Sequence, residues 1–121
     1  MPAPPAPSWV PQVSGPKDLV GILSPIAQQF SPKGNWAIRV IPDTSWRHIA
    51  EETELGRGHS TYAMSDLASG MTYLKESAIR NNNPVVIQRI LAHEMGHLTL
   101  QTDNEDKAEG WAHTWLKKNK T

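Results

Sequence analysis

His93 and His97, four residues apart, and Glu94 between them are the side chains with the clearest capacity for chemistry in this sequence. On an α-helix, positions four apart lie on one face, so both imidazoles can reach a single metal ion. Glu94 stands beside the first histidine, where it can act on a water molecule at the metal instead of binding the metal itself. The pattern therefore predicts a Zn2+ site for hydrolysis, with His93 and His97 as metal ligands and Glu94 as the general base.

The third metal ligand has to come from another part of the chain. Catalytic zinc takes three protein ligands and keeps one position for water, and this chain has no cysteine to offer. A helix is predicted at the end of the sequence, from Glu105 to Lys118. It carries four candidate ligands, Glu105, Asp106, Glu109 and His113. At about 100° per residue, Glu105 lies closest to the centre of the apolar face of that helix. Glu105 is therefore favoured, with Glu109 and then His113 as alternatives.

Peptide hydrolysis also needs a hydrogen-bond donor for the oxyanion and a surface that holds the substrate. Tyr73 is the candidate oxyanion stabiliser, with Tyr62, His59 and His113 as alternatives. Tyr73 belongs to a strand predicted over residues 71–75, which we expect at an open edge of the sheet. An extended peptide or protein substrate can pair with such an edge and lie across the metal.

Short strands and amphipathic helices are expected to position these side chains. Alternating apolar and β-branched residues predict strands at residues 36–41, 59–65 and 71–75, the last two joined as a hairpin. Apolar residues that recur every three to four positions predict helices. The helices are expected at residues 16–30, from Ser45 to about Thr53, from Pro84 through both histidines, and from Glu105 to Lys118 with Asp103 or Asn104 as the cap.

These elements indicate an α+β fold of the zincin-like type, with a small three-stranded sheet packed against the histidine helix and one or two further helices. Six of the ten prolines lie within the first 16 residues, which predicts an extended proline-rich arm over residues 1–15. The rest of the 121-residue chain, residues 16–121, is expected to form one domain with a small core.

The composition narrows the classes of partner and location. The chain has 12 basic and 12 acidic residues, so no basic surface argues for nucleic acid. No apolar run is long enough to span a membrane, and the first residues have neither the basic nor the apolar region of a signal peptide. We therefore expect a cytoplasmic protein, treated as a monomer, with a peptide or protein as its substrate.

A known family shares the residues around this site. Residues 91–97 read L-A-H-E-M-G-H, and they are followed by Glu105, Ala108, Trp111 and Ala112. This series resembles the A-H-E-x-G-H and E-x-x-A-N-x-F-A segments of the ImmA/IrrE-type family, a branch of the gluzincin metallopeptidases. The resemblance covers roughly residues 60–116. It implies zinc held by His93, His97 and Glu105. It also implies that Glu94 is the catalytic glutamate and that a small sheet lies over two or three helices.

Two departures from that family matter. Glu109 stands where the family usually has asparagine, and the spacer after His97 is short. The sequence also shows no helix-turn-helix or sensor segment, so a minimal stand-alone gluzincin is the closer description. The alternative is a catalytically silent zinc-binding domain that serves as a structural or interaction module. In that case Glu109 or His113 would supply a fourth ligand and close the site.

Overall fold

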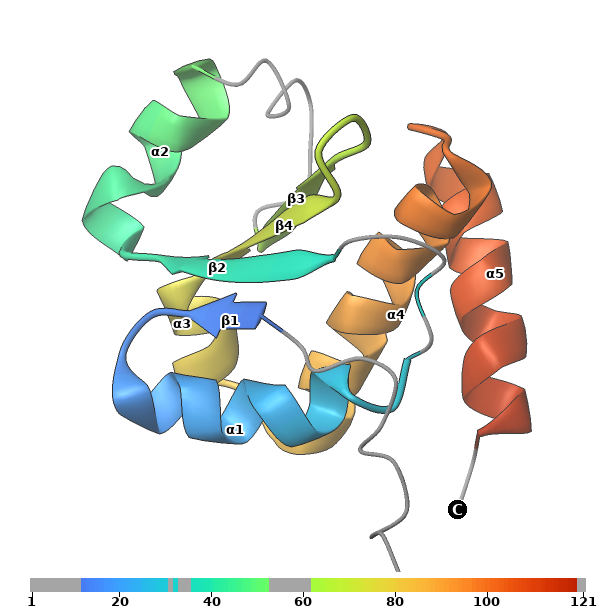
Figure 1. The fold of residues 1–121 in the computed structure, drawn as a ribbon, viewed down its shortest axis with the longest axis horizontal. Coiled ribbons are helices and arrows are strands. Elements are labelled where there is room, and N and C mark those ends of the chain that lie inside the picture. Colours follow the sequence, from blue (N-terminus) through green and yellow to red (C-terminus); the bar gives the residue numbers. More distant parts are fainter. Residues whose placement is uncertain (1–11, 31, 33–35, 53–61, 120–121) are drawn as a thin grey trace, which may run out of the picture.

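The computed structural model describes residues 12–30, 32, 36–52 and 62–119 of the chain, and it shows an α+β protein (Figure 1). The described residues form four strands and five helices. In chain order these are β1 (Gln12–Ser14), α1 (Lys17–Ala27), β2 (Ala37–Ile41), α2 (Asp43–Glu52), β3 (Ala63–Asp66), β4 (Met71–Lys75), α3 (Glu76–Arg80), α4 (Pro84–Leu100) and α5 (Glu105–Lys118).

The four strands form one mixed sheet in the order β1-β2-β4-β3. β1, β2 and β4 run parallel, whereas β3 pairs antiparallel with β4 through the predicted hairpin. The expected three-stranded sheet is therefore wrong by one strand. The additional strand is β1, within the segment predicted as an arm, and residues 1–11 of that segment lie outside the described residues. β1 escaped prediction because three residues between Pro11 and Pro16 carry too little periodicity to indicate a strand.

The strand at residues 71–75 is not an edge, contrary to our expectation. β4 lies between β2 and β3 and pairs with both of them. The parallel connection from β2 through α2 and the hairpin returns β4 to the middle of the sheet and leaves β3 at its edge. Only the pairing of distant segments decides this order, so the sequence pattern of β4 alone could not reveal it.

The two faces of the sheet are covered by different helices (Figure 1). Successive side chains of a strand point to opposite faces. On one face, Ile38, Leu74 and Ala63 pack with apolar side chains of α1 and α4 to form the main core. On the other face, Ile41 and Met64 pack with Trp46 of α2 in a second, smaller cluster. The site helix α4 therefore lies against one face only.

Local signals fix where the two helices of the site begin and end. Asn83 caps α4 by accepting a hydrogen bond from the Val86 amide, and Pro84 occupies the first turn. Gln101 ends α4 with a left-handed conformation, φ 50°. Asn104 then caps α5, accepting from the Lys107 amide. The predicted starts of these two helices are confirmed, and the four-residue connection from 101 to 104 returns α5 antiparallel along α4 (Figure 1).

α4 and α5 approach each other closely at one glycine. A Cβ added to Gly96 would lie 2.5 Å from the carbonyl oxygen and 3.0 Å from the Cα of Ala108. Gly96 therefore allows the backbone of α5 to approach α4, because it has no side chain at this contact. Among the described residues, no helix is both long enough and apolar enough to cross a lipid bilayer.

Candidate metal centre

The two histidines of α4 converge as the sequence predicts. The Nε2 atoms of His93 and His97 lie 3.2 Å apart, and the two rings are nearly perpendicular. One ligand atom from each of His93, Glu94 and His97 can be chosen so that all three lie within 4.8 Å of one another. This group could hold a metal ion.

Each histidine is oriented by an acceptor at its other ring nitrogen. His97 Nδ1 lies 2.8 Å from the Thr102 carbonyl oxygen, and His93 Nδ1 lies 2.6 Å from Glu109 Oε2. A carbonyl oxygen and an ionised carboxylate can only accept, so Nδ1 carries a proton in both rings. Both Nε2 atoms are thereby directed at the same point, in the arrangement by which outer contacts orient metal-binding histidines.

Glu105 joins the histidine pair from the first turn of α5. Its Oε2 lies 2.6 Å from His93 Nε2, and its Oε1 lies 3.3 Å from His97 Nε2. Ligands about 2.0–2.2 Å from a tetrahedral zinc ion are separated by roughly 3.3 Å. The 3.2 Å between the histidine nitrogens and the 3.3 Å from His97 to Glu105 match that separation. The 2.6 Å between His93 Nε2 and Glu105 Oε2 is shorter and is a direct hydrogen bond. Glu105 therefore lies where its carboxylate could join His93 and His97 around a metal ion.

Glu94 is placed differently from Glu105. Its side chain is buried against the sheet, with 3% of the residue exposed, and its Oε1 accepts a hydrogen bond of 2.9 Å from Ser65 Oγ of β3. Burial raises the pKa of Glu94, and the Ser65 hydrogen bond and the two histidines only partly oppose that shift. Glu94 is therefore a member of the candidate metal group whose carboxylate is also anchored to the sheet.

The exposed carboxylates of α5 set the charge balance at the histidines. Burial lowers the pKa of His93, but its hydrogen bonds to Glu109 and Glu105 more than compensate and hold that pKa above its usual value. Burial also raises the pKa of Glu105, whereas the hydrogen bond and charge of His93 and the charge of His97 bring it below its usual value overall. The two carboxylates of α5 therefore favour the protonated form of His93, the form that competes with a bound cation.

Three further residues have positions that the sequence did not reveal. Glu109 was weighed only as an alternative ligand, but its carboxylate contacts the outer nitrogen of His93. Its place four residues after Glu105, on one helix face, was the available signal. Ser65 and Thr72 behind Glu94 had no signal, because strand pairing alone brings them together.

Tyr73 lies away from the metal group. Its side chain packs with Ile41, Trp46 and Met64 on the sheet face that α2 covers, whereas α4 packs on the opposite face. Tyr73 pairs in register with Met64, so both point to that outer face. The structure does not bring Tyr73 to the histidines, and we assign it no role there. The alternative Tyr62 is 52% exposed, and His59 lies outside the described residues.

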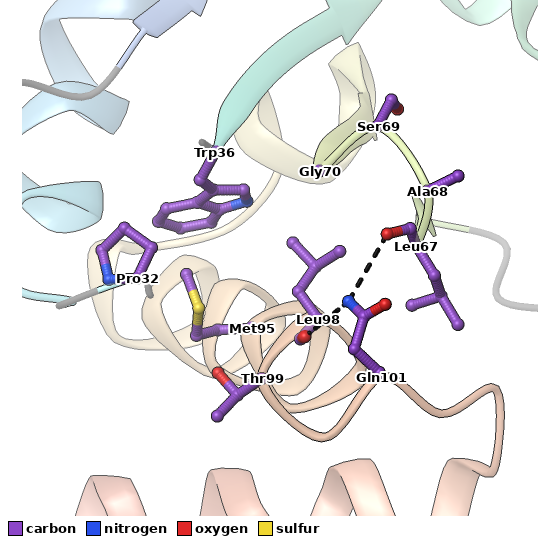
Figure 2. A pocket seen from close by; sticks show the side chains of 10 residues that line it. All are labelled: Pro32, Trp36, Leu67, Ala68, Ser69, Gly70, Met95, Leu98, Thr99 and Gln101. Carbon is purple, nitrogen blue, oxygen red and sulfur yellow. Dashed lines mark hydrogen bonds between the residues drawn. The ribbon is translucent and has the colours of Figure 1, made fainter. Parts of the chain in front are cut away.

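A cavity of about 460 Å³ lies near the same helix but is separate from the metal group. Figure 2 shows its lining, which comes from Pro32, Trp36, the β3–β4 turn at residues 67–70, Met95, Leu98, Thr99 and Gln101. None of the histidines or site glutamates lines it. Viewed along the axis of α4, Leu98 and Met95 lie about 40° and 100° from Glu94 in one direction of rotation. The two histidines lie about 60–100° from Glu94 in the opposite direction. The cavity therefore opens on another side of α4.

Comparisons with known proteins gave no match among protein-family models, curated proteins or solved structures. The fold class and the metal group are therefore defined by the residues and contacts of this chain alone. They establish an α+β protein with a mixed four-stranded sheet and a His93-Glu94-His97 group that could hold a metal ion.

Proposed function

We propose that this protein is a zinc-dependent metallopeptidase with a zincin-like site of the gluzincin type. One observation carries the proposal. Donor atoms of His93, His97 and Glu105 converge, with two of the three separations close to those around tetrahedral zinc and the third, between His93 and Glu105, a hydrogen bond of 2.6 Å. Ser65 anchors the Glu94 carboxylate near the two histidines. Three ligands and an adjacent carboxylate are the requirements of hydrolysis by a metal-activated water.

Zinc is the proposed metal because of the donor chemistry. Two imidazole nitrogens and one carboxylate form a mixed nitrogen and oxygen set, which suits zinc better than calcium or magnesium, whose preferred ligands are oxygens. The Nδ1 contacts to Glu109 and Thr102 leave both Nε2 atoms available as ligands. A bound zinc ion would lower the pKa of a water ligand and polarise the scissile carbonyl.

Glu94 is proposed to perform the proton transfers. It would accept a proton from the attacking water and deliver it to the nitrogen of the leaving amine. Burial raises the pKa of Glu94 above the usual glutamate value, which makes its carboxylate a stronger proton acceptor. The fixed contact of Oε1 with Ser65 leaves the second carboxylate oxygen for this exchange.

The proposed substrate is a peptide or protein, in keeping with the cytoplasmic location inferred from the sequence. β3 is the edge strand next to the site, because its Ser65 contacts Glu94 directly. An extended peptide added alongside β3 would run past the metal group, with main-chain hydrogen bonds holding it in register. This edge replaces β4 in our account of where a substrate binds.

Zinc content and cleavage of a peptide library by the full chain and three variants test the proposal. The wild type is expected to bind one zinc per chain and to cleave peptides. Glu94→Gln should keep zinc but lose cleavage by about 10²–10⁴-fold, because only the proton acceptor is removed. His97→Ala and Glu105→Ala should lose both. Wild-type cleavage by Glu94→Gln would exclude Glu94 as the base.

The same variants separate a peptidase from a silent, closed zinc site. A closed site needs four protein ligands. Glu109 contacts the outer nitrogen of His93, Nδ1, whereas Glu94 belongs with His93 and His97 to the group that could hold a metal ion, so Glu94 is the candidate fourth ligand. If Glu94 were that fourth ligand, Glu94→Gln would lower the zinc affinity, and a hydroxamate would not bind the zinc-loaded wild type. An open site predicts unchanged zinc affinity in Glu94→Gln and hydroxamate binding to the wild type.

A further inference from the structure

The buried face of β4 contains a polar residue where the pattern calls for an apolar one. Thr72 is fully buried, on the same strand face as the core residue Leu74 and in register with the core residue Ile38. A hydroxyl in such surroundings is unfavourable unless it is hydrogen-bonded. Thr72 Oγ1 has two partners: Trp36 Nε1 at 2.9 Å and Ser65 Oγ at 3.0 Å.

These contacts form a series of hydrogen bonds that ends at Glu94. Ser65 lies directly opposite Thr72 in the β3–β4 hairpin, so the two side chains meet on the face covered by α4. Ser65 Oγ in turn lies 2.9 Å from Glu94 Oε1. The series Trp36, Thr72, Ser65, Glu94 thus crosses from the start of β2 through β4 and β3 to the site helix.

Simple donor and acceptor rules give this series of hydrogen bonds one direction. An indole nitrogen can only donate, so Thr72 accepts from Trp36. An ionised carboxylate can only accept, so the single hydroxyl proton of Ser65 points to Glu94. Ser65 must then accept from Thr72, whose own proton is free for that bond. Each hydroxyl donates once and accepts once, and no buried side-chain polar atom in the described residues lacks a partner.

We infer that Ser65 is a positioning residue for Glu94, and that Thr72, itself oriented by Trp36, fixes the direction of the Ser65 hydroxyl. This role rests on the proposed function, in which Glu94 is the general base. This series of hydrogen bonds holds Oε1 against the sheet and thereby limits the rotation of a carboxylate that has one oxygen near the two histidines. Without the Ser65 proton, the carboxylate would lose its hydrogen bond to β3 and could rotate away from the reacting water.

The kinetic test uses the zinc-loaded full chain and paired substitutions. Ser65→Ala is expected to lower kcat by about 10–100-fold with KM and zinc affinity changed less than about twofold, because orientation and not binding is lost. Ser65→Thr keeps the hydroxyl and should recover most of kcat. Thr72→Val should lower kcat by a smaller factor than Ser65→Ala does. Thr72→Ser, which keeps the hydroxyl, should leave kcat unchanged. Ser69→Ala, an exposed serine on the same hairpin, is the control.

A second measurement tests the position of the Glu94 carboxylate without using cleavage. If the wild type cleaves no peptide, the proposed function is refuted, but this measurement still tests whether Ser65 positions Glu94. The ¹³C signal of the Glu94 carboxyl group, identified by its loss in Glu94→Gln, is followed in each zinc-loaded variant. Ser65→Ala should shift it, while Ser65→Thr and Ser69→Ala should not. An unchanged signal in Ser65→Ala overturns the inference. If the protein is active, a fall in kcat no larger than the loss of folded protein, measured by thermal unfolding, also overturns the inference.

Discussion

His93 is contacted by a carboxylate at each ring nitrogen. Glu109 holds Nδ1 and Glu105 holds Nε2, each at 2.6 Å. When zinc binds, the proton on Nε2 must leave, while the contact at Nδ1 can remain. Glu109 is therefore suited to orient the histidine and increase its basicity without binding the metal.

Removing this outer contact should weaken zinc binding without abolishing it. Glu109→Ala is expected to lower zinc affinity about 10–100-fold, as for other outer contacts of metal-binding histidines. Competition with a chromophoric chelator measures the affinity, and Asp106→Ala, an exposed carboxylate on the same helix, should have little effect. Complete loss of zinc, as expected for His97→Ala, would instead identify Glu109 as a ligand.

Zinc affinity should also depend on pH in a defined direction. A raised pKa means that His93 keeps its competing proton to a higher pH than an ordinary histidine, whose pKa is about 6.5. Zinc affinity is therefore expected to fall as the pH drops through this raised value, starting above pH 6.5. Zinc titrations between about pH 8 and about pH 5.5, a range on both sides of a typical histidine pKa, measure this dependence. An affinity independent of pH would argue against histidine ligands.

At the scale of elements, the site depends on how closely α4 and α5 pack. α4 carries both histidines and Glu94, whereas α5 carries Glu105 and Glu109. The helices meet at Gly96, where the backbone of Ala108 fills the space that a side chain would need. The separation between the ligands of the two helices is therefore set by one glycine.

A methyl group at this contact should damage both stability and metal binding. Gly96→Ala is expected to destabilise the fold by about 1–3 kcal/mol through overpacking and to weaken zinc binding by moving Glu105 from the histidines. Gly110 is the matched control, because a Cβ there meets nothing within 4 Å. Gly110→Ala should stabilise α5 by about 0.5–1 kcal/mol. Urea unfolding and zinc titration of both variants measure these effects. Equal behaviour of the two would refute the packing argument.

At the scale of the whole molecule, zinc would add a further link between segments that packing and hydrogen bonds already join. The ligands come from two helices, and Glu94 beside them is bonded to β3 at the edge of the sheet. A metal that binds only the folded arrangement adds its binding free energy to the stability of the fold. The metal-free and zinc-loaded proteins should therefore differ in thermal stability.

Thermal unfolding with and without zinc measures how much the bound metal stabilises the fold. Free zinc at a hundredfold excess over its Kd should stabilise the fold by about 2.7 kcal/mol. For a domain of this size, that corresponds to a rise in Tm on the order of 10 °C. His97→Ala should show no such rise. A rise of the same size in His97→Ala would place the zinc elsewhere in the protein.

Local features of the sequence determined much of the site helix. The spacing of His93 and His97, the Asn83–Pro84 start of α4 and the Asn104 cap of α5 all depend on residues within a few positions of one another. Such interactions can be inferred from sequence because helical periodicity and capping act over one or two turns. The same reasoning favoured Glu105, which the structure places against both histidines.

Only the tertiary structure decided what depends on distant segments. The strand order put β3 and not β4 at the edge, added β1 to the sheet and turned Tyr73 to the face opposite α4. Strand pairing also brought Ser65 and Thr72 behind Glu94, and helix packing brought Glu109 to His93. These contacts join residues far apart in sequence, and their geometry follows from which surfaces bury one another. No local propensity specifies that choice.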